Sequence, residues 1–344
     1  MNYKVSVIIP TYNVGNFISG TVESIINQTI GFENIEVIIV DDGSTDSTID
    51  ILKGYSQKYD NIKCFFPEGN SGTPGRGRNM GIDNATSDYI MFLDADDRYV
   101  ENVCEVLLDV ISETGKDIVI CNHKVVNNHD FSDVSKFNQD FSYKIYSTND
   151  EIVFHDPYMW NKIFKKDFLN KYNIRCFDKY YGEDSYFCVK SYLNTDEVPI
   201  LNNFIGYIYN VRDSEDDSSF SNSYDINGFC RFLKGFYKIV TLIKDAGRQD
   251  LVDCLMKKEF LVIFSKFVLF DSGSNSKRDV LEELYKFQKY CDIDSQLGEK
   301  WASIFFKLLE KRKFNILLLY SNILNSIYTS KRIRTFYRNF HMAN

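Results

Sequence analysis

The sequence predicts an α/β protein with a doubly wound, mostly parallel sheet, followed by an α-helical C-terminal region. Over the first 125 residues, short apolar runs of strand length alternate with segments of helical spacing. This alternation is typical of parallel strands joined by crossover helices. From Gly228 onward the apolar residues keep helical spacing alone, so the change of pattern predicts two structural regions.

Five apolar runs are the candidate strands of the sheet. Residues 37–40 are apolar at every position, as expected for a parallel strand that is covered on both faces. Ligands of such sheets bind where the strands end, so the polar residues that follow the runs are the candidate site. The runs cover residues 4–10, 35–41, 62–66, 89–94 and 118–122.

Helical spacing appears between these runs, in residues 18–26, 49–55 and 103–111. Residues 123–222 are mixed, and we expect extended segments and helices there. The extended segments cover 124–127, 143–146 and 198–211, and the helices cover 161–172 and 183–193.

The stretch 213–227 contains few apolar residues and separates the mixed part from the helical part. We therefore predict a first domain over residues 1–222, with halves at 1–122 and 123–222. A helical second domain covers residues 223–344.

Charge and composition exclude several classes of protein. The formal net charge of −8 argues against a nucleic-acid partner, because such proteins are usually basic. No secretory leader is visible, and no uncharged apolar stretch reaches the roughly 18 residues of a membrane span. The eight cysteines are scattered without a CxxC pair, which excludes the common zinc and redox motifs. We expect a cytoplasmic protein with reduced thiols.

The first candidate segment follows the first strand and reads Pro10, Thr11, Tyr12 and Asn13. An aromatic side chain with small polar neighbours suits stacking on a planar base. An ordinary strand-to-helix turn is the alternative. The GxGxxG pattern of a dinucleotide-binding fold is absent here.

Asp41 and Asp42 follow the second strand. Two carboxylates at a strand end can accept the N–H of a pyrimidine and the hydroxyls of a ribose. The alternative is an acid that caps the next helix.

Residues 69–81 contain five of the 18 glycines, together with Asn70, Arg76 and Arg78. Glycine allows backbone to approach a ligand closely, and arginine pairs with a diphosphate. The glycine spacing resembles a P-loop. However, Arg78 and Asn79 stand where Lys and Ser or Thr are required, so we exclude a P-loop NTPase.

Asp94 and Asp96 flank Ala95 after the fourth strand. Carboxylates two apart at a strand end can chelate one hard cation, and Mg²⁺ or Mn²⁺ suits carboxylate and phosphate oxygens best. Such a metal would bridge a diphosphate and neutralise a leaving group. A solvated acidic turn is the alternative. An aspartyl phosphatase places its acids after the first strand instead.

Glu183 and Asp184 begin the helical pattern at 183–193. One of them can serve as a general base that takes a proton from an acceptor hydroxyl. A helix cap with a dipole partner is the alternative.

The ordered set VSVIIPTYN, VIIVDDGSTD, GRGRNMGI, YIMFLDADD and GED resembles glycosyltransferase family 2, whose GT-A fold has a Rossmann-like, mostly parallel sheet. The resemblance runs from Val5 to about Asn222. The segment WNKIF at 160–164 also resembles bacterial members that decorate capsules, teichoic acids or surface glycans. The resemblance implies inverting transfer of a sugar from a nucleotide diphosphate, usually UDP, to a glycan, polyol-phosphate or lipid-linked hydroxyl.

The resemblance also implies roles for individual residues. Asp96 matches the main metal ligand, and Asp94 matches the acid nearer the ribose and donor. Asp184 matches the catalytic base, with Glu183 beside it on the acceptor side. For the donor, Pro10, Tyr12 and Asp42 match positions that hold the base, Asn70 and Arg78 match the loop near the uracil and diphosphate, and Arg212 resembles a flexible-loop residue near the diphosphate.

Two further segments are candidates for acceptor and partner contacts. Trp160, Asn161 and Lys162 either line an acceptor groove or belong to the core. Residues 306–344 contain eight Lys or Arg and one Glu, a net charge of +7, among many apolar residues. Such a segment contacts an anionic membrane surface at the inner face of the cell membrane, a partner subunit, or its own domain.

Two other functions compete with a glycosyltransferase. A nucleotidyltransferase also combines a parallel sheet, a Gly/Arg loop and acidic metal ligands. It would carry that loop directly after the first strand, where Pro10–Asn13 stands instead. A catalytically silent partner subunit is the non-enzyme alternative, and the presence of Asp94, Asp96 and Asp184 argues against it.

Overall fold

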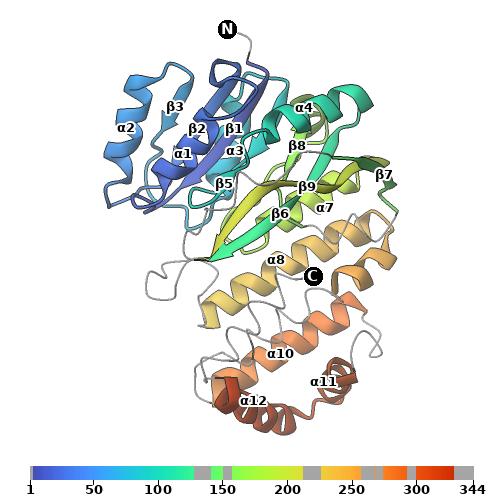
Figure 1. Cartoon of the computed structure of the whole chain (residues 1–344). Coiled ribbons are helices and arrows are strands. Elements are labelled where there is room, and N and C mark those ends of the chain that lie inside the picture. The colour runs from blue at the N-terminus through green and yellow to red at the C-terminus, as the bar shows by residue number, and fades with distance from the viewer. Residues whose placement is uncertain are drawn as a thin grey trace. The chain divides into compact units, whose positions relative to one another are not determined.

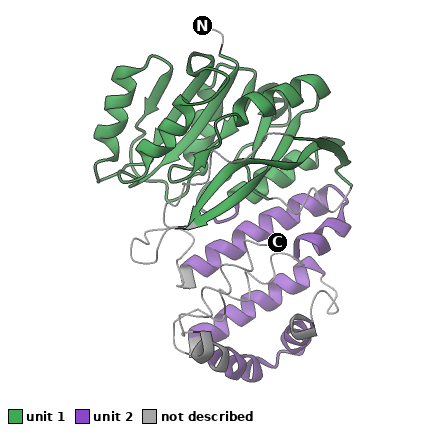
Figure 2. Ribbon diagram, in the orientation of Figure 1, with its two compact units in different colours: residues 1–179, 183–218 green, residues 180–182, 219–344 purple. Residues whose placement is uncertain are grey.

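The computed structural model describes residues 3–127, 141–149, 157–211, 226–256, 267, 274–292 and 300–328. The chain divides into two compact units (Figure 2). The first contains residues 1–179 and 183–218, and the second contains residues 180–182 and 219–344. A nine-stranded sheet forms the centre of the first unit, and the described part of the second is helical (Figure 1).

The first four strands pair in parallel in the order β3-β2-β1-β4. Every residue of β2 is buried, which agrees with the prediction from its unbroken apolar run. The strands are β1 (Val5–Thr11), β2 (Ile35–Asp41), β3 (Ile62–Phe65) and β4 (Tyr89–Phe92).

The rest of the sheet is mixed. Strand β8 runs antiparallel to both β4 and β6, whereas β9 runs parallel to β6 and antiparallel to β5 and β7. These strands are β5 (Arg98–Tyr99), β6 (Ile118–Asn127), β7 (Tyr143–Ser147), β8 (Lys162–Lys165) and β9 (Glu197–Val211).

The helix predicted over 161–172 is wrong in its first part, which forms β8. The helix α6 (Lys166–Lys171) begins only after this strand. Ile163 and Phe164 pair with residues of both β4 and β6 and are fully buried. Strand pairing on both sides outweighs the local helical spacing of this short segment.

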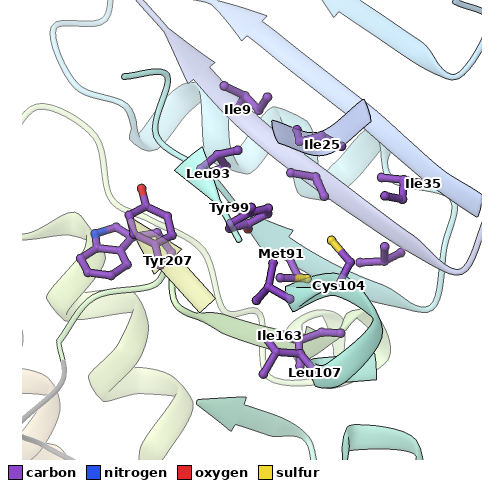
Figure 3. Packing of buried hydrophobic residues seen from close by; sticks show 14 of the residues in the cluster. Ile9, Ile25, Ile35, Met91, Leu93, Tyr99, Cys104, Leu107, Ile163 and Tyr207 are labelled. Carbon is purple, nitrogen blue, oxygen red and sulfur yellow. The ribbon is translucent and has the colours of Figure 1, made fainter. Parts of the chain in front are cut away.

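Helices cover both faces of the sheet. On one face, α1 and α4 pack on the buried cluster that contains Ile9, Met91 and Ile163 (Figure 3). On the other face, Phe187 of α7 packs against Phe92 and Phe164. The helices of this unit are α1 (Ile18–Ile26), α2 (Thr48–Lys58), α3 (Gly75–Asn84), α4 (Val103–Thr114), α6 and α7 (Glu183–Tyr192), with a 3-10 turn at Phe32–Asn34.

The second unit is built from amphipathic helices. Helix α8 buries Phe232, Phe236 and Ile239, and its Tyr237 ring meets Phe287 of α10 edge-on. No helix within the described ranges is long and apolar enough to cross a membrane. The helices are α8 (Ile226–Asp245), α10 (Ser274–Cys291), α11 (Lys300–Glu310) and α12 (Phe314–Tyr328).

Candidate active site

The predicted nucleotide-binding residues lie where three neighbouring strands end. In the parallel register, Thr11 of β1 lies opposite Asp41 of β2. Strand β1 also pairs with β4, on the side away from β2, and Asp94 follows the end of β4. Because adjacent parallel strands end at the same edge of the sheet, the segments after β1, β2 and β4 meet there.

Asp41 is buried and holds the turn that follows β2. Its Oδ1 accepts the backbone N–H of Ser44 at 2.9 Å, and its Oδ2 accepts the Ser44 hydroxyl at 2.5 Å. The hydroxyl of Thr11 also donates to Oδ2, at 3.2 Å. Asp41 therefore fixes the backbone beside Asp42.

Asp42 joins this turn to the glycine-rich loop. Its carboxylate accepts hydrogen bonds from Arg76, at 3.0 Å from Nε and 2.5 Å from Nη2, and from the Ser71 backbone N–H at 2.8 Å. Arg76 also donates to the carbonyl oxygens of Glu68 and Gly69. The predicted Asp42 and Arg76 thus form one ion pair at the edge of the sheet.

Tyr12 is exposed, whereas the side chains of Thr11 and Asn13 on either side of it form hydrogen bonds. The residue is 45% exposed. Asn13 has a positive φ of 51°, and its Oδ1 accepts the backbone N–H of Thr45 at 2.8 Å. The exposed ring of Tyr12 is therefore held on a fixed backbone.

The glycines of the segment 69–81 divide into two groups. Gly69 and Gly72 have positive φ angles in the loop, where exposed Asn70 accepts the Gly72 N–H at 2.6 Å. Gly77 and Gly81 belong to α3, and a Cβ on Gly81 would lie 2.3 Å from Ile8 Cγ2. The sequence predicts that these glycines let a ligand approach the backbone. For Gly77 and Gly81, the structure shows instead that the missing side chain lets α3 pack closely on β1.

Arg78 is the centre of the site. It projects from α3 and is buried, and its two Nη atoms reach carboxylates from different elements. Nη1 donates to Glu183 Oε1 at 2.9 Å, and Nη2 donates to Asp94 Oδ1 at 2.8 Å. Burial opposes its charge, but these two carboxylates raise the pKa of Arg78 above its ordinary value. Arg78 Nε is buried without a hydrogen-bond partner among the described residues.

Glu183 and Asp184 begin α7, as the sequence predicts. Burial and the neighbouring Asp184 raise the pKa of Glu183 to about 7, although Arg78 opposes the shift. Burial also raises the pKa of Asp184, whose Oδ1 accepts the Ser185 N–H at 2.7 Å. The two carboxyls therefore hold protons at higher pH than exposed carboxyls do.

The turn after β4 contains three acids with different surroundings. Asp94 is 27% exposed at its side chain and pairs with Arg78, and Asp96 is half-buried beyond the buried Ala95. Asp97 is buried, and its oxygens accept the Tyr207 hydroxyl at 2.5 Å and the Asn210 N–H at 2.7 Å.

Sequence reasoning missed the parts that Asp97 and Tyr207 play in this turn. A third acid directly after Asp96 and a tyrosine in the extended segment 198–211 were the available signals. Neither signal indicates that the two side chains meet.

Trp160, Asn161 and Lys162 are buried in the first unit. The Trp160 ring lies between the rings of Tyr158 and Tyr207, with ring centroids 4.8 Å and 4.1 Å away. Asn161 Nδ2 donates to the Cys121 carbonyl at 2.7 Å, and Lys162 Nζ donates to Asn161 Oδ1 at 2.8 Å. The Asn161 bond joins the residues just before β8 to β6. The predicted Arg212 lies outside the described residues.

The site thus gathers Arg78, Asp94, Glu183 and Asp184 within one unit, next to the Asp42–Arg76 pair. Asp94 and Asp96 supply carboxylate oxygens of the kind that hard divalent cations prefer. Among the described residues, no group of three or more His, Cys, Asp or Glu side chains forms a metal site. A cation here would therefore need further oxygens from a ligand, such as a diphosphate.

Comparison with known proteins assigns a family to one domain of the chain. Residues 6–172 match the family model described as Glycosyl transferase family 2. The poly(ribitol-phosphate) beta-glucosyltransferase of Bacillus spizizenii is 33% identical over 217 residues, which are 62% of this chain and 33% of that protein. The poly(ribitol-phosphate) beta-N-acetylglucosaminyltransferase TarS of Staphylococcus aureus strain MW2 is 30% identical over 218 residues, 63% of this chain and 37% of that protein. The chain spans about a third of the length of these two relatives.

A solved structure shows the same fold. The crystal structure of S. aureus TarS 1-349 in complex with UDP-GlcNAc matches with a TM-score of 0.69 and 23% identity, over 98% of this chain and 92% of that chain. The predicted GT-A fold with a helical C-terminal region is confirmed. The chain therefore contains a domain of glycosyltransferase family 2, which covers residues 6–172.

Proposed function

We propose that the chain is a metal-dependent, inverting glycosyltransferase. It transfers a sugar from a UDP-sugar to a hydroxyl of a polyol-phosphate, glycan or lipid-linked acceptor of the cell surface. One observation carries this proposal: buried Arg78 bonds to Asp94 at 2.8 Å and to Glu183 at 2.9 Å, which brings the acidic turn after β4 to the carboxylate pair of α7.

The choice of substrates rests on the relatives. Two of them are named as poly(ribitol-phosphate) transferases of glucose or N-acetylglucosamine. A structure of the same fold holds UDP-GlcNAc. These names support a UDP-sugar donor, and among the proposed acceptors they favour a polyol phosphate.

Asp94 and Asp96 are the residues that would hold Mn²⁺ or Mg²⁺, because they offer carboxylate oxygens at the end of β4. When bound, the cation supplies charge neutralisation for the leaving diphosphate. The buried and permanently charged Arg78 adds a second cation at the same place, and its unpartnered Nε is a donor that an anionic ligand can use.

The nucleoside half of the donor would lie over the ends of β1 and β2. The exposed ring of Tyr12 offers a stacking surface for uracil, and Pro10, Thr11 and Asn13 shape the backbone beneath it. Asp41 orders the turn that carries Asp42, the candidate acceptor for the uracil N–H. Asn70, Arg76 and Arg212 are the further candidates for donor contacts.

Asp184 is the proposed general base. It accepts the proton of the acceptor hydroxyl while the oxygen of that hydroxyl attacks the anomeric carbon, and the bond to the diphosphate breaks on the opposite face. Glu183 orients Arg78 through their ion pair, and Arg78 stabilises the charge that develops on the leaving oxygen. A single displacement of this kind inverts the configuration of the sugar.

A donor screen tests this proposal. The protein is incubated with UDP-glucose, UDP-galactose and UDP-GlcNAc, with Mn²⁺, Mg²⁺ or EDTA, and UDP release is measured. We expect release from one donor and its loss in EDTA. No release of UDP from any donor, with ribitol-phosphate oligomers supplied as acceptor, contradicts the proposal.

We further propose a contact role for residues 306–344, at an anionic membrane surface on the cytoplasmic side or at a partner subunit. In the described part, Ile316 and Leu319 of α12 are 51% and 63% exposed. Lys311 and Lys313 are exposed just before this helix. Sedimentation with phosphatidylglycerol vesicles tests the membrane contact, and analytical ultracentrifugation tests the contact with a partner subunit. A monomer that does not pellet with vesicles contradicts both.

A further inference from the structure

The acidic turn at residues 94–97 is held from the β9 side by one hydroxyl group. The Tyr207 oxygen accepts the backbone N–H of Asp94 at 3.2 Å and donates its own proton to Asp97 Oδ2 at 2.5 Å. The other oxygen of Asp97 accepts the Asn210 N–H at 2.7 Å. One tyrosine therefore ties the first and the last residue of the turn to β9.

The same turn is also held by α1. The Thr21 hydroxyl lies 2.8 Å from the Ala95 carbonyl oxygen and 2.9 Å from the Asp97 carbonyl oxygen. The Asp97 N–H also donates to the Asp94 carbonyl at 3.1 Å within the turn. Ala95 and Asp97 are buried, whereas Asp94 and Asp96 keep partial exposure.

Packing determines the position of the Tyr207 hydroxyl. The ring is fully buried and stacks on Trp160, with centroids 4.1 Å apart and planes 23° apart. The Tyr99 ring meets it edge-on at 5.9 Å, in the same buried cluster as Leu93 (Figure 3). A side chain enclosed in this way presents its oxygen to the turn in one place.

The Asp97 side chain is directed to β9. Both of its oxygens accept hydrogen bonds from β9, and the residue is 1% exposed. Both oxygens are therefore occupied by bonds to β9, whereas Asp94 and Asp96 are more exposed.

We propose that Tyr207 and Asp97 are positioning residues for the metal- and diphosphate-binding carboxylates of Asp94 and Asp96. This inference rests on the proposed function. Groups that orient metal ligands from behind typically contribute about 10–100-fold to metal affinity. Loss of the Tyr207 hydroxyl frees the Asp94 backbone and leaves a buried Asp97 oxygen without its donor, so both ligands lose their fixed geometry.

Isothermal titration of UDP tests the inference, in saturating Mn²⁺ and in EDTA, on the full chain. Tyr207→Phe keeps the ring and removes the hydroxyl. We expect the ratio of the UDP Kd in EDTA to the Kd in Mn²⁺ to fall about tenfold in this variant. We expect the Kd in EDTA to stay at the wild-type value, because the base-binding residues are untouched.

Tyr99→Phe is the matched control. Tyr99 is also buried, and its hydroxyl donates to the Phe92 carbonyl at 2.6 Å rather than to the acidic turn. A merely structural role for Tyr207 would make both variants less stable to heat and leave both Kd ratios at the wild-type value, and that result overturns the inference.

A second pair of variants covers the case in which Tyr207→Phe does not fold. Thr21→Val removes the other hydroxyl that holds the turn, and Thr21→Ser keeps it. We expect Thr21→Val to have a reduced ratio of the UDP Kd in EDTA to that in Mn²⁺, and Thr21→Ser to have the wild-type ratio. Equal ratios in the two variants overturn the inference. A wild-type protein that binds UDP equally with and without Mn²⁺ overturns the proposed metal role and this inference together. A metal effect that persists in Tyr207→Phe overturns the inference alone.

Discussion

Arg78 Nη1 donates a hydrogen bond of 2.9 Å to Glu183 Oε1, although the two residues are 105 positions apart in the chain. The pair is almost completely buried and connects α3 to the start of α7. Through its other nitrogen Arg78 also reaches Asp94. The donor-side and acceptor-side carboxylates of the proposed reaction are thus joined by one cation.

Removal of this cation should reduce stability. Arg78→Met leaves Glu183 buried without its partner, so we expect the free energy of unfolding to fall by about 3 kcal/mol. Adding Glu183→Gln should restore at least about 1 kcal/mol, because the buried charge is then gone as well. Urea denaturation of the single and double variants measures this coupling.

Lys286→Met is the control for the Arg78 variants. Lys286 pairs with Glu283 at 2.6 Å on the surface of α10, where both side chains are exposed. We expect a loss below about 1 kcal/mol, as for other exposed ion pairs. A similar small loss in Arg78→Met would contradict the burial of the Arg78 site.

The raised pKa values of the carboxylate pair predict an acid limb in the activity. Burial raises the pKa of Glu183 to about 7 and raises that of Asp184. The proposed base Asp184 must be ionised to accept a proton, so kcat/KM should decline with falling pH at a higher pH than an ordinary aspartate would give. Glu183→Gln removes a neighbouring negative charge, which makes ionisation of Asp184 easier.

The pH profile of kcat/KM for UDP release therefore distinguishes the wild-type protein from Glu183→Gln. We expect the acid limb of Glu183→Gln to lie at lower pH than that of the wild type. Because the two carboxyls interact, the wild-type midpoint belongs to the pair rather than to either residue. An acid limb that is unmoved by the substitution argues against a link between Glu183 and the base.

Asp96 should carry the metal dependence of donor binding. Asp96→Ala removes one of the two proposed carboxylate ligands, so we expect UDP to bind as weakly in Mn²⁺ as in EDTA. Asp109→Ala, in α4, removes an acid away from the site and should keep the metal effect. Isothermal titration provides both values, and an unchanged affinity of Asp96→Ala in Mn²⁺ speaks against the metal role.

The polar residues at the strand ends of the site could be predicted because each stands at the end of an apolar run. Asp42 comes directly after the run 35–41, and Asp94 is the last residue of the run 89–94. The parallel pairing of β2, β1 and β4 brings both residues to one edge of the sheet. The start of α7 at Glu183 was also predicted from helical spacing. Local pattern suffices where burial on both faces determines the element.

The contacts that complete the site depend on the tertiary structure. Tyr207 and Asp97 are 110 positions apart, and the antiparallel pairing of β5 with β9 brings them together. The short strand β8 was missed because its pairing with β4 and β6 outweighs helical spacing. In the sequence, Gly81 belongs to a glycine-rich segment that indicates a ligand-binding loop. In the structure it lies in α3, where the absence of a side chain allows close contact with Ile8.

Turnover of the Asp184→Asn variant tests the central claim most directly. This amide cannot accept the acceptor proton, and general-base assistance is worth about 10²–10⁴-fold. With the donor that the screen identifies, we predict a fall in kcat of at least about 100-fold and an unchanged Kd for UDP. Asp167→Asn, an exposed acid in the first turn of α6, should keep wild-type turnover. A kcat of Asp184→Asn close to that of the wild type would contradict the account.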